Sequence, residues 1–356
     1  MNNDIIRNPF SIMFGKEPVQ AVDRTKIINE ICSVFSDEKP VQQMYLITGI
    51  RGSGKSAITG RIMKEFSGMK DWIVIDLNVE QPMREALLGR LAAISELKVL
   101  FSKAKLSFTA FGINASVEGK NVPVNVDAEL DAALNILTRH GKRILITIDD
   151  VVSNSEMRSF AHFFQSCLMK DYDVFLLMNG IFENIDTLQN EKSLTFLLRA
   201  PKIQLEPLNL TAVSNLYGRV FRYPVETLNK MASITEGYPF AVQALGYICW
   251  NNAADKKNIK PDEYMQEFDY YLEDNVYDKL WSDMSDVDRD IITAVVNEDS
   301  NAADVKSIIQ SSGISTSMVS NYKKRLLKKG IIKDVYGKFV LSLPRFGEFV
   351  KRQYEF

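Results

Sequence analysis

Residues 45–56 read YLITGIRGSGKS, an apolar run followed by a glycine-rich segment that ends in lysine and serine. From Gly49 onward the spacing is that of a phosphate-binding loop: glycine, any four residues, glycine, lysine, then serine or threonine. Glycines let the backbone wrap around a phosphate so that successive N–H groups point inward, and the helix expected to open at Ala57 adds its positive end. The pattern predicts a nucleotide site formed by Gly49, Gly52, Ser53, Gly54, Lys55 and Ser56.

The loop predicts roles for two of its residues and a partner on another strand. Lys55 would reach the β- and γ-phosphates, and the Ser56 hydroxyl would bind Mg²⁺. Residues 144–150 read ILITIDD, a buried strand that ends in two acids. Carboxylates at the carboxyl end of a parallel strand lie at the ligand edge of the sheet. We therefore predict that Asp149 holds Mg²⁺ and that Asp150 polarises the attacking water, with an acidic surface turn as the alternative.

Two further residues are candidates for the same chemistry. Asn179 follows the apolar run 174–178, so its amide could orient the attacking water at the strand tip. The alternative is an ordinary Asn-Gly turn with Gly180. Arg199 follows an apolar helical stretch and could stabilise charge in the transition state. A solvated surface arginine is the alternative there.

These motifs resemble those of AAA+ ATPases, in particular a bacterial and archaeal group similar to origin-recognition initiators, over nearly the whole chain. The resemblance implies ATP and Mg²⁺ as cofactors, ATP hydrolysis and a nucleotide-dependent homo-oligomer. It also implies that residues 8–24 flank the adenine, that Asn179 is the sensor asparagine, and that Arg199 reaches a neighbouring subunit's nucleotide. It rests on Asn8-Pro9-Phe10, Phe14-Gly15, Pro18, Val22-Asp23-Arg24, the phosphate loop, Asp149-Asp150, Asn179, Thr195-Phe196-Leu197-Leu198-Arg199-Ala200 and Gly237-Tyr238-Pro239-Phe240.

The chain departs from this family at two places. The family usually has Asp-Glu at the strand end, whereas Asp150 is one methylene shorter, so slow hydrolysis or a non-hydrolysing regulator is the alternative to an efficient ATPase. Many lids carry an arginine near the start of a helix, whereas this one has Gly237-Tyr238-Pro239. That form resembles signalling-type relatives, in which the proline contacts the adenine, and it makes Pro239 a predicted nucleotide contact.

The pattern along the chain predicts an α/β fold with three domains. The first 200 residues alternate short apolar runs with helical stretches, including a helix over Pro82–Leu100, which is typical of a parallel sheet. Residues 105–126 instead alternate with period two and suggest an inserted antiparallel β-hairpin, before a helix capped by Asp127. This hairpin could contact a subunit or DNA, or be structural only. We predict an AAA+ P-loop domain over 1–208, a helical lid over 209–284 and a C-terminal winged helix-turn-helix over 285–356.

The C-terminal region carries the predicted nucleic-acid surface. From residue 313 to 356 there are ten basic and three acidic residues, although the whole chain has 43 basic and 45 acidic ones. The pattern of this region is that of a winged helix: two helices, a third helix over Ser315–Lys329, and a hairpin around Tyr336-Gly337-Lys338. With Val319, Tyr322 and Leu326 facing the core, the third helix turns its other side outward for double-stranded DNA. The predicted contacts are Ser317, Asn321, Lys324, Lys328 and the wing residue Lys338, and docking of a protein is the alternative.

Composition limits the remaining function classes. The chain has 356 residues, 46% of them hydrophobic, which is ordinary for a globular protein. Three scattered cysteines and two histidines form no metal or redox motif. The first residues lack the apolar core of a signal peptide, and no apolar run approaches the length of a membrane helix. We therefore expect a cytoplasmic protein without membrane contact.

Overall fold

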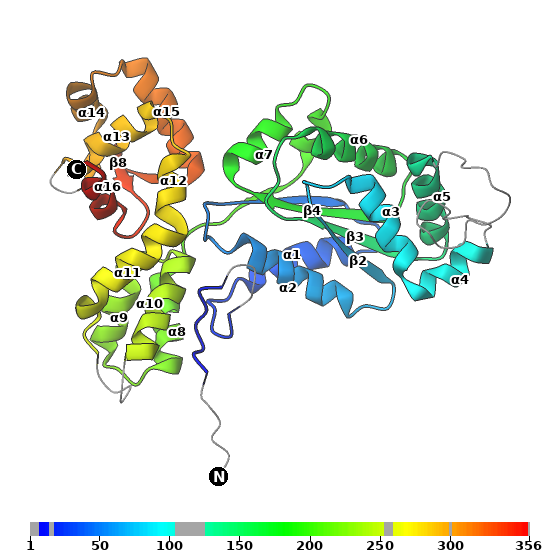
Figure 1. The fold of residues 1–356 in the computed structure, drawn as a ribbon, viewed down its shortest axis with the longest axis horizontal. Coiled ribbons are helices and arrows are strands. Elements are labelled where there is room, and N and C mark those ends of the chain that lie inside the picture. The colour runs from blue at the N-terminus through cyan, green and yellow to red at the C-terminus, as the bar shows by residue number, and fades with distance from the viewer. Residues whose placement is uncertain (1–6, 14–17, 104–124, 253–258, 299–300, 355–356) are drawn as a thin grey trace, which may run out of the picture. The chain divides into compact units, whose positions relative to one another are not determined.

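The computed structural model of the chain contains two compact units (Figure 1). The sheet unit comprises residues 24–48 and 58–204, and the helical unit comprises residues 1–23, 49–57 and 205–356. The phosphate-loop residues thus belong to the unit that also contains the C-terminal part of the chain. The domain limits predicted at residues 208 and 284 stay predictions. The structure describes residues 7–13, 18–103, 125–252, 259–298 and 301–354.

Five parallel strands form the sheet unit's core, in the order β2-β3-β4-β1-β5. Ile148 at the end of β3 pairs with Met178 of β4, and Thr48 at the end of β1 pairs with Gly180 of β4. These three strands therefore end at one edge of the sheet, where ligands bind in open parallel sheets. The strands are β1 Met44–Thr48, β2 Trp72–Leu77, β3 Arg143–Ile148, β4 Val174–Gly180 and β5 Lys202–Gln204.

The helices around this sheet differ from the sequence expectation at their ends. The predicted helix over Pro82–Leu100 is two helices, because Ile94 adopts an extended conformation between them. The helix predicted to be capped by Asp127 starts at Val126, and the Asn125 side chain caps it by accepting from the Ala128 N–H. The helices are α1 Thr25–Ser36, α2 Lys55–Ser67, α3 Met83–Ala93, α4 Ser95–Lys103, α5 Val126–Arg139, α6 Ser155–Met169, α7 Phe182–Gln189 and the 3₁₀ helix η2 Thr195–Arg199.

The predicted hairpin at residues 105–126 lies almost wholly outside the described residues, which exclude 104–124. Its predicted end was wrong, since Val126 already belongs to α5.

Both faces of the sheet are covered, which is why its strands are continuous apolar runs. Alternate residues of β4 face opposite sides, so Val174, Leu176 and Met178 join a core with α3, α5 and α6. Phe175 faces the other way and contacts the rings of Phe35 on α1 and Trp72 on β2. Figure 1 shows α1 and α2 on one side of the sheet and α3 and α6 on the other. The side chain of Asn179, two residues after Leu177, consequently lies on the α2 side.

The described residues between 210 and 282 of the helical unit form helices, and we call this segment the lid. Asn209 caps its first helix by accepting from the Ala212 N–H, as the sequence predicted, and Pro224 precedes the second. The third helix starts at Pro239, whose fixed φ suits the first helical position. The lid elements are α8 Leu210–Val220, α9 Val225–Ile234, α10 Pro239–Asn252, η3 Pro261–Tyr264, α11 Met265–Leu272, the π-helical turn η4 Glu273–Tyr277 and α12 Asp278–Ser282.

The described residues from 286 to 354, which we call the C-terminal module, contain the three predicted helices and the predicted hairpin. Gly313 and Gly330 end two of the helices with positive φ, which glycine adopts without strain. Val335 pairs with Lys338 across a two-residue turn, and three antiparallel strands lie in the order β6-β8-β7. The elements are α13 Asp286–Val296, β6 Ala302–Ala303, α14 Val305–Ser312, α15 Thr316–Lys329, β7 Ile332–Val335, β8 Lys338–Leu341 and α16 Phe346–Tyr354.

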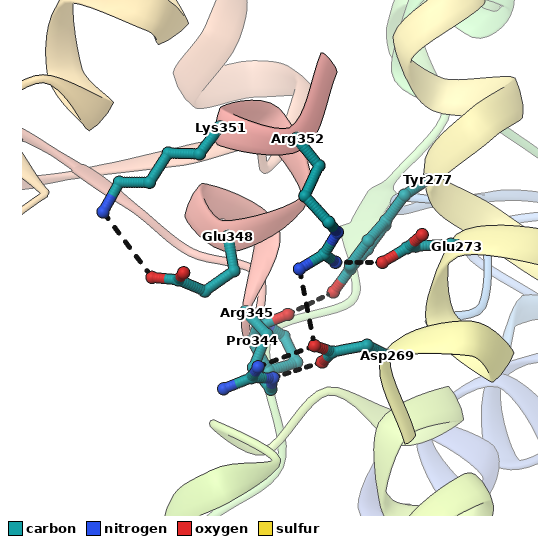
Figure 2. Close-up of polar contacts among 8 residues, drawn as sticks. All are labelled: Asp269, Glu273, Tyr277, Pro344, Arg345, Glu348, Lys351 and Arg352. Carbon is teal, nitrogen blue, oxygen red and sulfur yellow. Dashed lines mark hydrogen bonds and ion pairs between the residues drawn. The ribbon is translucent and has the colours of Figure 1, made fainter. Parts of the chain in front are cut away.

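A cluster of charged groups joins this module to helix α11 and the turn η4 of the lid (Figure 2). Arg345 donates two hydrogen bonds to Asp269 of α11, and Arg352 of α16 pairs with Glu273 and with the same Asp269. Tyr277 donates its hydroxyl to the Pro344 carbonyl, and its buried ring packs edge-on against Phe346. The lid and the C-terminal module accordingly share one hydrophobic core.

No helix in the described part of the chain is both long and apolar enough to cross a membrane.

Candidate functional site: a phosphate loop and an acidic strand end

The phosphate loop of the helical unit has the geometry that its sequence predicts. Gly52 and Gly54 have φ of 72° and 91°, a conformation that favours glycine, and a Cβ on Gly49 would lie 2.5 Å from the Ser53 hydroxyl. Helix α2 starts at Lys55, two residues earlier than predicted, so its first N–H groups lie within the loop. Glycine therefore suits this loop for two reasons: the positive φ at Gly52 and Gly54, and the lack of room for a Cβ at Gly49 and Gly52.

Polar groups inside this loop fit a phosphate. The Ser53 hydroxyl is buried and has no hydrogen-bond partner among the described residues. Lys55 donates from Nζ to the carbonyls of Gly49 and Ile50, at 3.0 and 3.1 Å, so its ammonium group is held over the loop. An anion would satisfy the buried donor and lie beside a fixed cation at a helix N-terminus.

Two residues of the lid donate hydrogen bonds to the backbone of the same loop. The Tyr238 hydroxyl donates to the Arg51 carbonyl, and the Phe240 N–H donates to the Gly52 carbonyl at 3.1 Å. A Cβ on Gly52 would lie 2.2 Å from the Tyr238 hydroxyl oxygen. Burial raises the pKa of Tyr238, so its phenol stays protonated and remains a donor. Pro239, predicted to contact the adenine, lies half-buried between these two lid residues.

The N-terminal segment is built into the lid. Phe10 is 2% exposed and stacks on Phe221, with ring centroids 5.6 Å apart. Gly246 of α10 makes room for it, because a Cβ there would lie 2.5 Å from the Phe10 ring. Gln243 accepts from the Ser11 N–H and donates to the Gln20 carbonyl at 2.8 Å. The resemblance implied that this segment flanks the adenine. The Phe10 ring is instead buried in the hydrophobic core of the lid.

In the sheet unit, the structure brings together Asp149, Asp150 and Asn179 as predicted. Asp149 is half-buried directly after β3, and Asp150 is exposed with a φ of 52°. The Asp150 N–H donates to Asp149 Oδ1 at 3.1 Å and to Asn179 Oδ1 at 3.3 Å. The two carboxylates thus lie at the ligand edge of the sheet, where they can bind a cation and a water molecule, and the buried Asn179 amide supports the Asp150 backbone.

Asn179 is part of β4, so the alternative of an Asn-Gly turn was wrong. Its side chain is 0% exposed, and its Nδ2 donates to the Thr59 hydroxyl of α2 at 2.8 Å. Sequence reasoning missed Thr59. The available signal was its place three residues after Ser56, on the same side of the predicted helix.

Arg199 ends η2 and is exposed, as a residue that reaches another molecule must be. Buried Gln189 fixes the turn by donating to the Leu197 carbonyl at 2.8 Å. The neighbouring Leu198 is 59% exposed. The structure thus presents a cation and an apolar side chain together on the surface of the sheet unit.

The side of α15 that the sequence assigned to DNA contact is exposed, and the opposite side is buried. Val319 and Leu326 are buried and Tyr322 is half-buried, which matches the predicted core stripe. All five predicted contact residues are exposed: Ser317, Asn321, Lys324, Lys328 and Lys338.

Seven basic residues of this region form ion pairs, which the sequence did not reveal. Buried Asp288 pairs with Arg325 at 3.2 Å and with Lys329 at 3.5 Å, and Lys323 pairs with Asp334. Further pairs join Lys333 to Glu236, Arg345 and Arg352 to Asp269, and Lys351 to Glu348. The excess of basic charge is therefore largely compensated within the helical unit.

Comparison with solved structures shows the fold. The Walker-type ATPase PABY2304 of Pyrococcus abyssi matches at 15% identity with a TM-score of 0.64, over 95% of this chain and 100% of that chain. The ORC2 protein of Aeropyrum pernix, solved in ADPNP-ADP complexes, matches at 12% identity with a TM-score of 0.61, over 96% of each chain. The chain has the AAA+ ATPase fold. Cdc6p from Pyrobaculum aerophilum is similar at 12% identity with a TM-score of 0.50, over 96% of this chain and 97% of that one.

Sequence comparisons add less. A family model described as "Domain of unknown function (DUF8462)" matches residues 274–350, which run from η4 of the lid into α16. The search of curated proteins found no match.

Proposed function

We propose that the protein is an ATP-dependent molecular switch that binds ATP with Mg²⁺ and hydrolyses it slowly. The proposal rests mainly on the phosphate loop. Its buried Ser53 hydroxyl, which has no hydrogen-bond partner among the described residues, and its Lys55 ammonium group can both bind a phosphate. The AAA+ fold supports the same proposal. Mg²⁺, held by Ser56 and Asp149, would neutralise charge on the phosphates.

The remaining site residues have distinct proposed roles. Asp150 polarises the attacking water, and Asn179 acts with it at the end of β4. Pro239 contacts the adenine, next to the two lid groups that hold the loop carbonyls. These lid contacts support the switch, because a loop that rearranges around a phosphate changes the acceptors of Tyr238 and Phe240.

Arg199 is proposed to act in trans, within a homo-oligomer that forms when ATP binds. Its exposure beside Leu198 supports this role. A cytoplasmic location is proposed as well, and the three free cysteines suit it.

The direct test measures labelled-ATP binding, phosphate release, and the molecular mass in solution with and without ATP. We expect binding, slow turnover and a larger assembly with ATP. Absence of ATP binding would refute the proposal.

Asp150→Asn should leave ATP affinity within about twofold of wild type and lower turnover by roughly 100-fold, a typical loss for a group that activates water. Asparagine keeps the preference for positive φ at this position, so the variant removes charge without adding backbone strain. Phosphate release under single-turnover conditions measures the effect. Asp150→Glu tests the length of the side chain, and faster turnover is expected from its longer reach. Equal turnover in Asp150→Asn and wild type would exclude Asp150 from the reaction.

We propose further that the C-terminal module is a winged helix that binds double-stranded DNA. Support comes from the exposed side of α15, where Asn321 can pair with a base edge and Lys324 and Lys328 can contact phosphates. Lys338 lies on the hairpin beyond the two-residue turn, the position of a wing.

Lys338→Gln should weaken binding of a mixed-sequence duplex and flatten its salt dependence by about one unit of log–log slope. The full chain with ATP is titrated by fluorescence anisotropy at several salt concentrations, and wild type should lose affinity with a slope of roughly −0.9 per phosphate neutralised. Lys98→Gln, which removes an exposed lysine of α4, is the matched control and should change neither quantity. Salt-independent or absent binding by wild type would remove the DNA proposal.

A second candidate is a signalling-type or non-hydrolysing regulator whose C-terminal module docks a protein. The extensive internal pairing of basic residues favours it, because such pairing leaves few cations for a phosphate backbone. Duplex binding as described above, together with phosphate release, separates the two candidates.

A further inference from the structure

A continuous chain of hydrogen bonds runs from helix α2 to the acidic strand end within the sheet unit. The Asn179 amide lies at its centre: Nδ2 donates to Thr59 Oγ1 at 2.8 Å, and Oδ1 accepts from the Asp150 N–H at 3.3 Å. Thr59 is 3% exposed and Asn179 is 0% exposed, so water cannot replace a lost partner without cost. Because the Asp150 N–H can only donate, it selects the Oδ1 end of the amide, and the Thr59 hydroxyl holds the Nδ2 end in place.

Asp150 needs this support because its backbone is in the left-handed region, with a φ of 52°. A non-glycine residue in this sparsely populated conformation persists only where its surroundings hold it there. Two oxygens accept from its N–H, Asn179 Oδ1 and Asp149 Oδ1. The next residue is fixed as well, since the Val151 N–H donates to the Asn179 carbonyl at 2.9 Å.

Thr59 also belongs to the helix that carries the phosphate-binding residues. It lies four residues after Lys55 and three after Ser56 on α2, which places it about one turn along the same side of the helix. A shift of α2 along its axis would move the Thr59 hydroxyl and, through the Asn179 amide, the Asp150 backbone.

We propose that Thr59 is a positioning residue for ATP hydrolysis. Through the Asn179 amide, Thr59 holds Asp150 in the left-handed conformation. In this conformation the Asp150 carboxylate is placed to polarise the attacking water. The inference rests on the proposed ATPase function and deepens it. It adds that the helix carrying Lys55 and Ser56 sets the position of Asp150 through side-chain hydrogen bonds.

The test compares Thr59→Val, which keeps the shape and removes the hydroxyl, with Thr59→Ser, which keeps the hydroxyl. Thr59→Val should lower kcat by about 10-fold or more and leave ATP affinity within about twofold, because positioning acts on the transition state rather than on binding. Thr59→Ser should retain most of kcat. Thr293→Val is the matched control, since that helical threonine has a buried hydroxyl with no partner among the described residues.

A second measurement does not depend on turnover. Amide hydrogen exchange at Asp150 and Val151 should be at least several-fold faster in Thr59→Val without nucleotide, and unchanged in Thr59→Ser and Thr293→Val. The double variant Thr59→Val with Asn179→Ala should be no slower in turnover than Asn179→Ala alone, because the two residues act as one unit.

Three results would overturn the inference: equal exchange in Thr59→Val and wild type, equal loss of kcat in Thr59→Val and Thr59→Ser, or an affinity that falls as much as kcat. If wild type binds no ATP, the proposed function fails instead. The exchange measurement then still decides whether Thr59 holds Asp150.

Discussion

Lys55→Ala is expected to weaken ATP binding by about 100-fold, on the order of 2.7 kcal/mol, because hydrogen bonds to charged groups contribute about 1.5–3 kcal/mol each. Lys55 is held over the loop by two backbone carbonyls, so its cation is in place before any phosphate arrives. The variant loses that cation and keeps every glycine of the loop. Equilibrium binding of labelled ATP gives the affinity directly.

The control for this prediction is Lys64→Ala, which removes an exposed lysine from the last turn of the same helix. Both variants should unfold at nearly the temperature of wild type. An unchanged affinity in a folded Lys55→Ala protein would contradict the assignment of the nucleotide site.

Phe10→Ala is expected to destabilise the helical unit by about 3–5 kcal/mol, the usual cost of deleting a buried phenylalanine side chain. The ring is 2% exposed, stacks on Phe221 and lies 5.8 Å from the Tyr217 ring, so its removal leaves a cavity among lid helices. Urea unfolding followed by tyrosine and tryptophan fluorescence measures the change. Gly246→Ala should act in the same direction, because its Cβ would displace the ring.

Met13→Ala is the matched control, since Met13 lies in the same segment and is 60% exposed. Its effect should stay within about 0.5 kcal/mol. A Phe10→Ala protein as stable as Met13→Ala would mean that the N-terminal segment does not pack into the lid.

The parts of the site that sequence predicted are those encoded by local rules. Three such features depend only on neighbours in the chain: the glycine spacing of the phosphate loop, the apolar runs of β3 and β4, and the glycines that end α14 and α15. Such features follow from backbone conformation and side-chain periodicity alone. The exposed side of α15 was predicted for the same reason.

The parts that sequence missed depend on contacts between distant residues. Thr59 and Asn179 are separated by 120 residues, and nothing near either one marks the hydrogen bond between them. The count of basic residues after Gly313 was correct, but their partners Asp288, Asp269 and Glu236 lie earlier in the chain. A charge balance over a contiguous window cannot register such pairs.

Helix ends were predicted only in part: the helices exist, but some of their first and last residues differ from the prediction. The capping role fell on Asn125 rather than Asp127, although both are good capping residues two positions apart. The chain breaks at Ile94 into two helices, α3 and α4. The apolar pattern predicted a single helix there, because both helices bury apolar side chains in the same core.

The packing of Phe10 into the lid has a consequence for the order in which the protein is made. Its ring partners Tyr217 and Phe221 follow it by more than 200 residues in the chain. At a synthesis rate of about 5–20 residues per second, the N-terminal segment leaves the ribosome roughly 10–40 s before its partners exist. The whole sheet unit, residues 24–48 and 58–204, is encoded in that interval, so a segment that emerges early is among the last to reach its native place. Until then an aromatic side chain that ends up buried stays accessible to chaperones.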